Sequence, residues 1–264
     1  MKIGLVYKDE NMKAKKLAFE VTSFLKQNGV DVLGEKNLDQ SEYVISLGGD
    51  GTLINKACKY AEIAVPFIGI NTGNLGFLTA AEGDEWKEAV LKLIKGDLIV
   101  SERIALEAKV VGKSETFRAV NEYTIKSQFR VADLEVKVNE KDFLKVYGDG
   151  VIVSTQSGST AYSLSAGGPI VDPNLNCILV TPVNPIGLPV PSAVLSPNSL
   201  VDIKLLKGED IYLVVDGQQS LRLKVGDVVR VKQAKNGVKF GYFDQNHFFK
   251  SLNAKFGLSK RREA

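Results

Sequence analysis

The sequence has 264 residues, of which 44% are hydrophobic, and its 34 basic and 31 acidic side chains give a formal net charge of +3. A chain of this length forms one large domain or two ordinary ones and buries a core of its own. The even charge balance argues against nucleic acid as a partner. The sequence has neither a run of about 18 apolar residues nor the apolar core of a signal peptide, so we expect no contact with a membrane.

Histidine and cysteine are too scarce for several kinds of chemistry. The chain has one histidine, His247, and two widely separated cysteines, Cys58 and Cys177. This usage excludes zinc ribbons, CxxC redox motifs and disulfide scaffolds, and it predicts no metal-ligating residues. Unpaired cysteines are typical of a reducing compartment, so we expect a cytoplasmic protein.

The first third of the chain predicts alternating strands and helices. Apolar runs indicate strands at 2–7, 30–33, 43–47 and 65–70, and helical spacing indicates helices at 12–27, 53–61 and 84–95, the last capped by Asp84. Strands that alternate with helices predict a doubly wound α/β domain with a parallel sheet over residues 1–97.

From Leu98 the pattern changes to short alternating runs, which predict a β-rich, sandwich-like domain over residues 98–240. One of these runs, Ala119 to Ile125, contains Asn121 and Glu122. Turn residues at 139–142 and at Asp216-Gly217-Gln218 fit hairpins.

Residues 173–201 contain no charged side chain, and six prolines stiffen the segment: Pro173, Pro182, Pro185, Pro189, Pro191 and Pro197. Prolines at this density are not expected in a central strand. An uncharged segment of this length predicts burial, either as a core-lining crossover or partly in a subunit interface.

The first candidate site is Gly48-Gly49-Asp50-Gly51-Thr52, between a strand and a helix. Glycines let backbone N–H groups approach phosphate oxygens, and ligands bind at such strand ends. An aspartate would repel a phosphate, so Asp50 indicates a metal ligand or a general base. The alternative is a plain Asp-Gly turn.

Three further segments carry candidate residues. The loop from Asn71 to Leu78 follows a strand, and Phe77 could stack on a ring, although such a residue often belongs to the core. Asn121-Glu122 could bind ribose hydroxyls or a base edge, or Glu122 could simply face solvent. Seven hydroxyl residues between Ser154 and Ser165 suit a polar or phosphate-bearing ligand, or could form a serine-rich turn.

In this order, these four segments, with Asp149-Gly150 before the last one, closely resemble the NAD kinase family over nearly the whole chain. The resemblance implies phosphorylation of the adenosine ribose 2′-hydroxyl of NAD to give NADP, with ATP or polyphosphate as donor. It implies that Asp50 is the general base and that Mg²⁺ or another divalent cation arrives with the donor. Family members are commonly homodimers or homotetramers, and their C-terminal stretch, here 241–264, rejoins the first domain.

Matched position by position, the resemblance assigns the nucleotide-binding residues. They are Asp50, Gly51, Phe77, Asn121, Glu122, Asp149, Thr160, Ala161, Tyr162, Ser165 and Asn184.

The chain departs from the family pattern at Thr155-Gln156-Ser157, where Thr-Pro-Thr is usual, and at Tyr147, where a basic residue is common. Two alternatives stay open: a lipid or sugar kinase that shares the GGDG motif, and a dinucleotide-binding module without activity. The hydroxyl-rich segment argues against a lipid acceptor. Asp50 argues against a module without activity, because binding alone gains nothing from this carboxylate.

Overall fold

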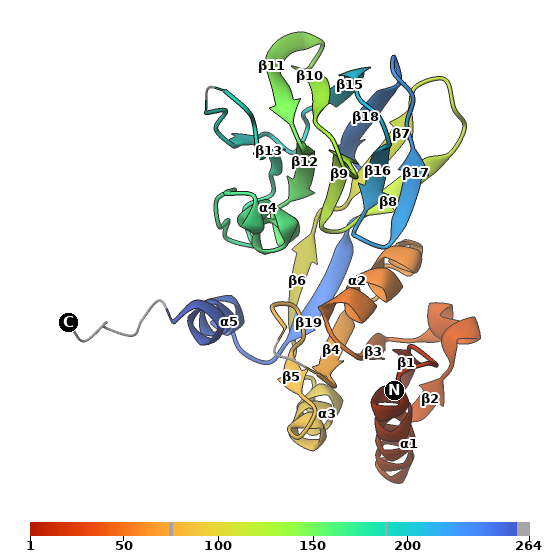
Figure 1. The fold of residues 1–264 in the computed structure, drawn as a ribbon. Helices are drawn as coiled ribbons and strands as arrows, with labels where there is room; N and C mark the ends of the chain where they lie inside the picture. Colours follow the sequence, from red (N-terminus) through yellow and green to blue (C-terminus); the bar gives the residue numbers. More distant parts are fainter. Residues whose placement is uncertain (74–75, 188, 258–264) are drawn as a thin grey trace, which may run out of the picture. The chain divides into compact units, whose positions relative to one another are not determined.

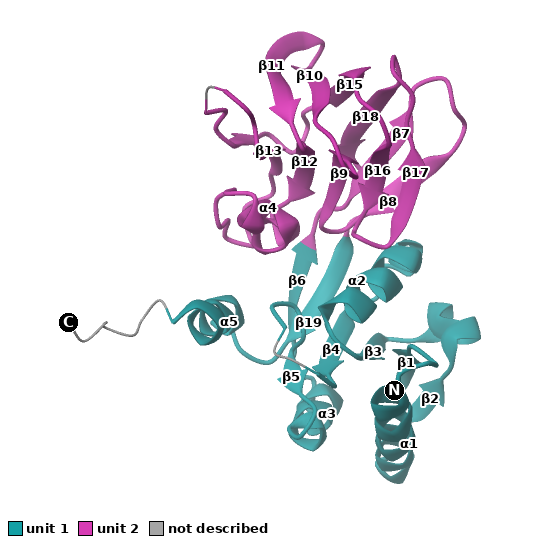
Figure 2. Cartoon of the chain, in the orientation of Figure 1, with its two compact units in different colours: residues 1–102, 238–264 teal, residues 103–237 magenta. Residues whose placement is uncertain are grey.

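The computed structural model describes residues 1–73, 76–187 and 189–257 (Figure 1). The chain forms two compact units: Met1–Glu102 with the C-terminal stretch from Val238, and Arg103–Gly237 (Figure 2). The first is an α/β unit and the second is built of antiparallel sheets, which confirms the predicted fold class. Within the described residues, no helix is both long and apolar enough to cross a membrane.

The first unit is organised around a seven-stranded sheet with the order β2-β1-β3-β4-β19-β6, and β5 pairs with β4. Its strands are β1 (Lys2–Tyr7), β2 (Asp31–Leu33), β3 (Tyr43–Leu47), β4 (Phe67–Asn71), β5 (Ala81–Glu82), β6 (Ile99–Arg103) and β19 (Val238–Tyr242). Strands β1 to β4 and β19 pair in parallel. β3 and β4 are apolar over almost their whole length because both faces of the sheet are covered.

The units change at 102/103 and 237/238, whereas the sequence placed the boundaries at 97/98 and 240/241. The difference arises because β6 and β19 lie in the sheet of the first unit. Alternating residues indicate a strand, but they do not say which sheet the strand joins.

Helices cover both faces of this sheet: α1 (Met12–Gln27), α2 (Asp50–Lys59) and α3 (Trp86–Lys95), with short 3₁₀ segments η1 (Glu35–Gln40) and η2 (Ala61–Ile63). α1 and α3 share one face, where the Phe24 and Trp86 rings meet edge to face at 5.4 Å. α2 lies on the other face, because a Cβ on Gly69 would meet its Leu53 side chain at 2.8 Å while the neighbouring Ile68 and Ile70 pack against α1 and α3.

The expected cap at Asp84 is wrong. The backbone N–H of Glu85 donates to the carbonyl of Glu82, so a turn occupies residues 82–85 and the helix begins only at Trp86, with Glu85 as its N-cap residue.

The second unit is a sandwich of two six-stranded sheets (Figure 1). One has the order β11 (Lys141–Gly148), β10 (Ala132–Val138), β15 (Val201–Lys207), β18 (Val228–Gln233), β7 (Leu106–Val110) and β8 (Thr116–Ala119). The other, called the ligand sheet below, has the order β14 (Ala193–Leu195), β13 (Ile178–Val183), β12 (Gly150–Thr155), β9 (Glu122–Ser127), β16 (Ile211–Val215) and β17 (Gln219–Arg222). Alternate residues of both sheets, such as Tyr123, Leu134 and Val153, form the core between them.

The predicted strand-like run from Ala119 to Ile125 belongs to two strands. β8 belongs to the first sheet and β9 to the ligand sheet, and the chain crosses between the sheets at Val120 and Asn121. Residues 120–122 therefore have a position that the local pattern did not predict.

The uncharged segment 173–201 is buried only in part. β13 is buried throughout, whereas Ile186 and Val194 are 58% and 57% exposed in the single chain. One of its prolines, Pro182, lies in β13 and pairs with Val151 of β12. β14 pairs only with residues 178–180, so β13 is an edge strand at Pro182, where proline is tolerated.

Candidate functional site

Asp50 lies where β3 passes into α2, at the carboxyl end of the parallel strands. Gly48 makes the turn with φ of +147°, a conformation that side chains rarely adopt, and α2 begins at Asp50. The carboxylate therefore lies in the first turn of a helix, where the backbone N–H groups favour negative charge.

The Asp50 carboxylate is fixed by three backbone N–H groups of the loop after β4. Oδ2 accepts from Phe77 at 2.6 Å, and Oδ1 accepts from Leu78 at 3.0 Å and Thr79 at 3.1 Å. The loop comes this close because residue 76 is glycine: a Cβ there would lie 2.2 Å from Asp50 Oδ1. A carboxylate has about four acceptor positions, so one remains for a ligand, on Oδ2.

Phe77 is held on its other side by the C-terminal helix α5 (His247–Phe256). Its ring lies 5.9 Å from that of Phe256 and 4.0 Å from Lys255 Nζ, and its carbonyl oxygen is 3.3 Å from His247 Nε2. Beside Asp50, a Cβ on Gly51 would meet no atom within 4 Å, which leaves open space there. The structure thus brings together the three predicted residues of the first unit. Residues 74 and 75 of the predicted loop lie outside the described residues.

In the second unit, Asn121 and Glu122 are anchored at the end of β9. Thr155 N–H donates to the Asn121 carbonyl at 2.9 Å, and Thr155 Oγ1 donates to the Val120 carbonyl at 2.6 Å. Glu122 is only 7% exposed, so the alternative in which it faces solvent is wrong. Asn121 Oδ1 and Glu122 Oε2 are buried and have no hydrogen-bond partner among the described residues, as expected of oxygens that bind a ligand.

The hydroxyl-rich segment lies over the outer face of the ligand sheet, as η3 (Ser157–Thr160) and α4 (Tyr162–Ser165). Ser163 Oγ is 2.9 Å from Thr181 Oγ1 of β13, and Lys126 Nζ of β9 is 5.6 Å from the Tyr162 ring. Ser154 and Ser157 add two buried hydroxyls without a partner among the described residues. Thr160 and Ala161 are half-buried and Ser165 is exposed.

Asp149 and Asn184 form a second polar pair at the other end of β12. Asn184 Nδ2 donates to Asp149 Oδ2 at 2.8 Å, and both residues are exposed. Gly148 permits this approach, because a Cβ there would lie 2.6 Å from the Asn184 carbonyl oxygen. Along β12, Gly150 and Ser154 mark the two ends of the site, about 13 Å apart at the usual rise per residue. Asp149 and Asn184 thus lie at one end of β12, and Glu122 pairs with Ser154 near its other end, a spacing that suits an elongated ligand.

Burial changes the acidity of two carboxyl groups in this unit. Loss of hydration, followed by the nearby charge of Asp216, raises the pKa of Glu122 to about 8. Burial also raises the pKa of Asp216, while hydrogen bonds from the Val120, Glu122 and Asn121 amides oppose the increase. Sequence reasoning missed Thr155 and Asp216 as parts of this site, because Thr155 looked like one hydroxyl among seven and Asp216 looked like a hairpin residue.

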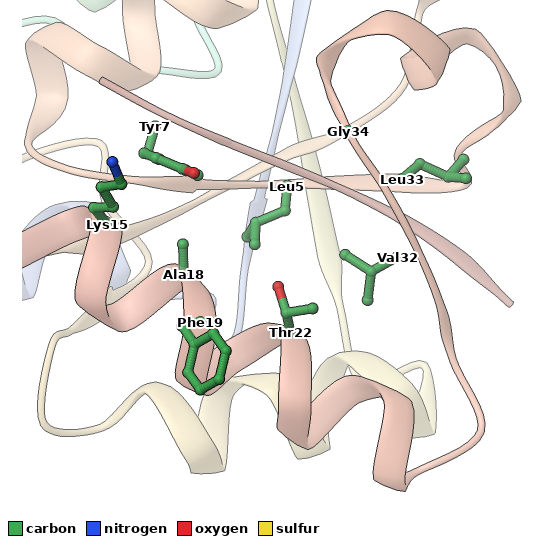
Figure 3. A pocket seen from close by; sticks show the side chains of 9 residues that line it. All are labelled: Leu5, Tyr7, Lys15, Ala18, Phe19, Thr22, Val32, Leu33 and Gly34. Atoms are coloured by element: carbon green, nitrogen blue, oxygen red, sulfur yellow. The ribbon is translucent and has the colours of Figure 1, made fainter. Parts of the chain in front are cut away.

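Two other features lie outside these clusters. The described part of the chain has no group of three or more His, Cys, Asp or Glu side chains that could hold a metal ion. A hollow of about 390 Å³ lies between α1 and the β1–β2 edge of the first unit (Figure 3), lined by Leu5, Tyr7, Lys15, Ala18, Phe19, Thr22, Val32, Leu33 and Gly34. None of the predicted site residues lines this hollow.

Comparisons with known proteins match both units. Residues 39–98 match the ATP-NAD kinase N-terminal domain, and residues 120–241 match the ATP-NAD kinase C-terminal domain. The NAD kinase of Caldicellulosiruptor bescii is 35% identical over 260 residues, which cover 97% of this chain and 99% of that protein.

Two solved structures are similar throughout. Yeast NADH kinase, complexed with NADH, has a TM-score of 0.85 at 22% identity, covering 100% of this chain and 90% of its own. The NAD kinase of Archaeoglobus fulgidus, in complex with ATP, has a TM-score of 0.79 at 26% identity, covering 96% and 99%. At 22% identity the yeast structure supports the fold alone.

Proposed function

The chain belongs to the NAD kinase family. We propose roles for its residues in the reaction, which transfers a phosphoryl group to the adenosine ribose 2′-hydroxyl of NAD and gives NADP. The observation that carries the proposal is the Asp50 carboxylate, fixed by three amides at a strand end with one acceptor position left on Oδ2. A lipid or sugar kinase, or a module that only binds, does not account for the match over both units.

Asp50 is the general base. A ribose hydroxyl is a weak nucleophile, so a carboxylate that takes its proton assists attack on the donor. As the 2′-oxygen bonds to the γ-phosphorus of ATP, its proton passes to Asp50 and the bond from phosphorus to the leaving ADP oxygen breaks. The three amides hold the carboxylate in one orientation and so reduce the entropy cost of the step.

The proposed NAD-binding residues come from both units. Gly51 and Phe77 serve from the first, and Asn121 and Glu122 bind through their unpartnered oxygens in the second. The other proposed contacts are Asp149, Thr160, Ala161, Tyr162, Ser165 and Asn184.

A divalent cation, Mg²⁺ in the simplest case, is proposed to arrive on the phosphates of the donor. Bound there, it neutralises charge that would otherwise repel Asp50. Asp50 is a poor sole ligand, because three of its acceptor positions are already used by amides.

The test is turnover by the purified full chain. NADP formation is followed with NAD, ATP and MgCl₂, then with EDTA, with polyphosphate in place of ATP, and with NADH in place of NAD. We expect NADP from ATP and NAD, abolished by EDTA. Absence of NADP with both ATP and polyphosphate would refute the assignment. The polyphosphate assay defines which donors are used, and the NADH assay defines which acceptors are used.

A homodimer or homotetramer is proposed as the working assembly. Its support is the exposed, uncharged part of segment 173–201, with Ile186 and Val194 on the surface and β14 as an edge strand. The cytoplasm is the proposed compartment, because Cys58 and Cys177 form no disulfide within the described residues. Light scattering tests the assembly, and cell fractionation tests the location.

A further inference from the structure

Asp216 is the first residue of the three-residue loop, 216–218, that joins β16 and β17. It has φ of +46° and is followed by Gly217 with φ of +66°. Asn, Asp and Gly all suit this type of turn, so the turn by itself does not require a carboxylate.

The Asp216 carboxylate binds three consecutive amides that lie 94 to 96 residues away in the sequence. Oδ2 accepts from Val120 N–H at 2.9 Å, and Oδ1 accepts from Asn121 N–H at 2.8 Å and Glu122 N–H at 2.9 Å. In addition, Asp216 N–H donates to the Glu122 carbonyl at 3.0 Å. The hairpin turn is therefore fixed to the point where the chain crosses between the two sheets.

Thr155 and Gly158 hold two of these residues, Val120 and Asn121, through their carbonyl groups. Thr155 binds the carbonyls of Val120 and Asn121, and a Cβ on Gly158 would lie 2.2 Å from the Asn121 carbonyl oxygen. With amides and carbonyls both held, the backbone of residues 120–122 has little freedom. This backbone sets where Asn121 Oδ1 and Glu122 Oε2, the unpartnered oxygens, point.

We propose that Asp216 is a positioning residue for NAD recognition, which orients Asn121 and Glu122 through their backbone amides without touching the nucleotide. The inference rests on the proposed role of Asn121 and Glu122 as NAD ligands. Charged acceptors make the stronger hydrogen bonds to N–H groups, so three bonds to one carboxylate hold this segment more tightly than a neutral side chain would.

The experiment compares Asp216→Ala and Asp216→Asn in the full-length enzyme. Alanine removes all three contacts, whereas an asparagine oxygen can keep the two from Asn121 and Glu122. We expect the KM for NAD to rise at least tenfold in Asp216→Ala and less in Asp216→Asn, while kcat and the KM for ATP stay within about twofold. A merely structural role would lower the amount of active enzyme and leave KM unchanged.

Asp210→Asn is the matched control, because Asp210 also has a positive φ, of +49°, at the other end of β16 but pairs with Arg222 instead. It should leave the KM for NAD unchanged. Should Asp216→Ala fail to fold, Asp216→Asn alone decides, and an unchanged KM in that variant overturns the proposal.

Two further variants, Glu122→Ala and the double variant Glu122→Ala with Asp216→Asn, separate the positioning role of Asp216 from the proposed role of Glu122 as an NAD ligand. If Asp216 acts through Glu122, its effect shrinks in the Glu122→Ala background. Full additivity overturns positioning through Glu122. If Asn121→Ala and Glu122→Ala both leave NAD binding unchanged, the proposed ligands themselves are wrong.

Discussion

The Asp50 carboxylate combines two tasks that a single substitution does not separate cleanly. It ties the loop at residues 77–79 to the start of α2, and it offers Oδ2 to a substrate hydroxyl. Its roles as anchor and as base have different signatures, since an anchor affects nucleotide binding while a base affects the chemical step.

We expect Asp50→Asn to lower kcat by about 10²- to 10⁴-fold, the usual contribution of a general base. The Kd for NAD should change only about threefold or less, because one amide oxygen can still accept two of the three N–H groups. Steady-state kinetics and calorimetry measure the two effects. Phe77→Leu is the control, with a raised Kd and a retained kcat. A wild-type kcat in Asp50→Asn would remove Asp50 from the chemical step.

Glu122 makes stability depend on pH. Its ordinary pKa of 4.5 is raised to about 8 in the folded protein, by burial and by the charge of Asp216. Between these values the folded protein holds a proton that the unfolded chain has lost, so the free energy of unfolding falls as pH rises through this window. The stabilisation is complete below pH 4.5 and lost above about 8. The raised pKa of Asp216 acts in the same direction.

Glu122→Gln should therefore flatten the decline in Tm between pH 4.5 and about 8, since glutamine does not titrate there. Thermal unfolding of both proteins across that range is the measurement. Glu209→Gln, at a side chain that is 73% exposed, should keep the wild-type slope. An equally steep decline in Glu122→Gln would show that Glu122 is not the group responsible.

Among the elements, β14 and its flanking loops are the least explained by the single chain. β14 is a three-residue edge strand in a segment without charge, and Val194 on it is exposed. Edge strands are usually short, charged or covered; this one is short, but it carries no charge and it exposes an apolar side chain, Val194. We therefore expect a second copy to cover it.

Val194→Asp tests this expectation. In the isolated chain the new carboxylate stays hydrated, so folding should be unaffected, whereas burial in an interface would cost several kcal/mol. We expect light scattering to show a smaller mass for Val194→Asp than for the wild type. Thermal unfolding should show that the dissociated variant is still folded. Val225→Asp, at a comparable exposure of 61%, should leave the mass unchanged. A monomeric wild type would leave the segment as a feature of the single chain.

At the scale of the whole molecule, the two units differ in how they are built from the chain. The second is one continuous stretch, Arg103–Gly237, with a core formed by its own two sheets. The first is discontinuous, because β19 returns from the C-terminal part and pairs between β4 and β6.

This difference predicts opposite results for two fragments. Residues 103–237 should fold alone, with a cooperative unfolding transition and a β-type circular dichroism spectrum, because their core is complete. Residues 1–102 should not fold, because β4 and β6 lose the strand between them and leave unpaired backbone groups. A cooperative transition in fragment 1–102 would contradict this account of β19.

The amino-acid pattern alone predicts the class of each unit and the location of the local motifs. Strand and helix periods are local properties, so the alternation of the first unit and the strand–loop–helix setting of Asp50 could be read from spacing. The seven hydroxyl residues between Ser154 and Ser165 were likewise visible as a cluster, and the order of the motifs indicated the family.

Which strands share a sheet, and which side chains become buried, became known from the three-dimensional fold. Asn121 and Glu122 look like part of one strand, but the chain changes sheets there and Glu122 is buried. Asp216 looks like a turn residue, but its carboxylate binds amides more than 90 residues away. The physical reason is that hydrogen bonding and loss of hydration depend on neighbours in space, and the period of a single segment carries no information about them.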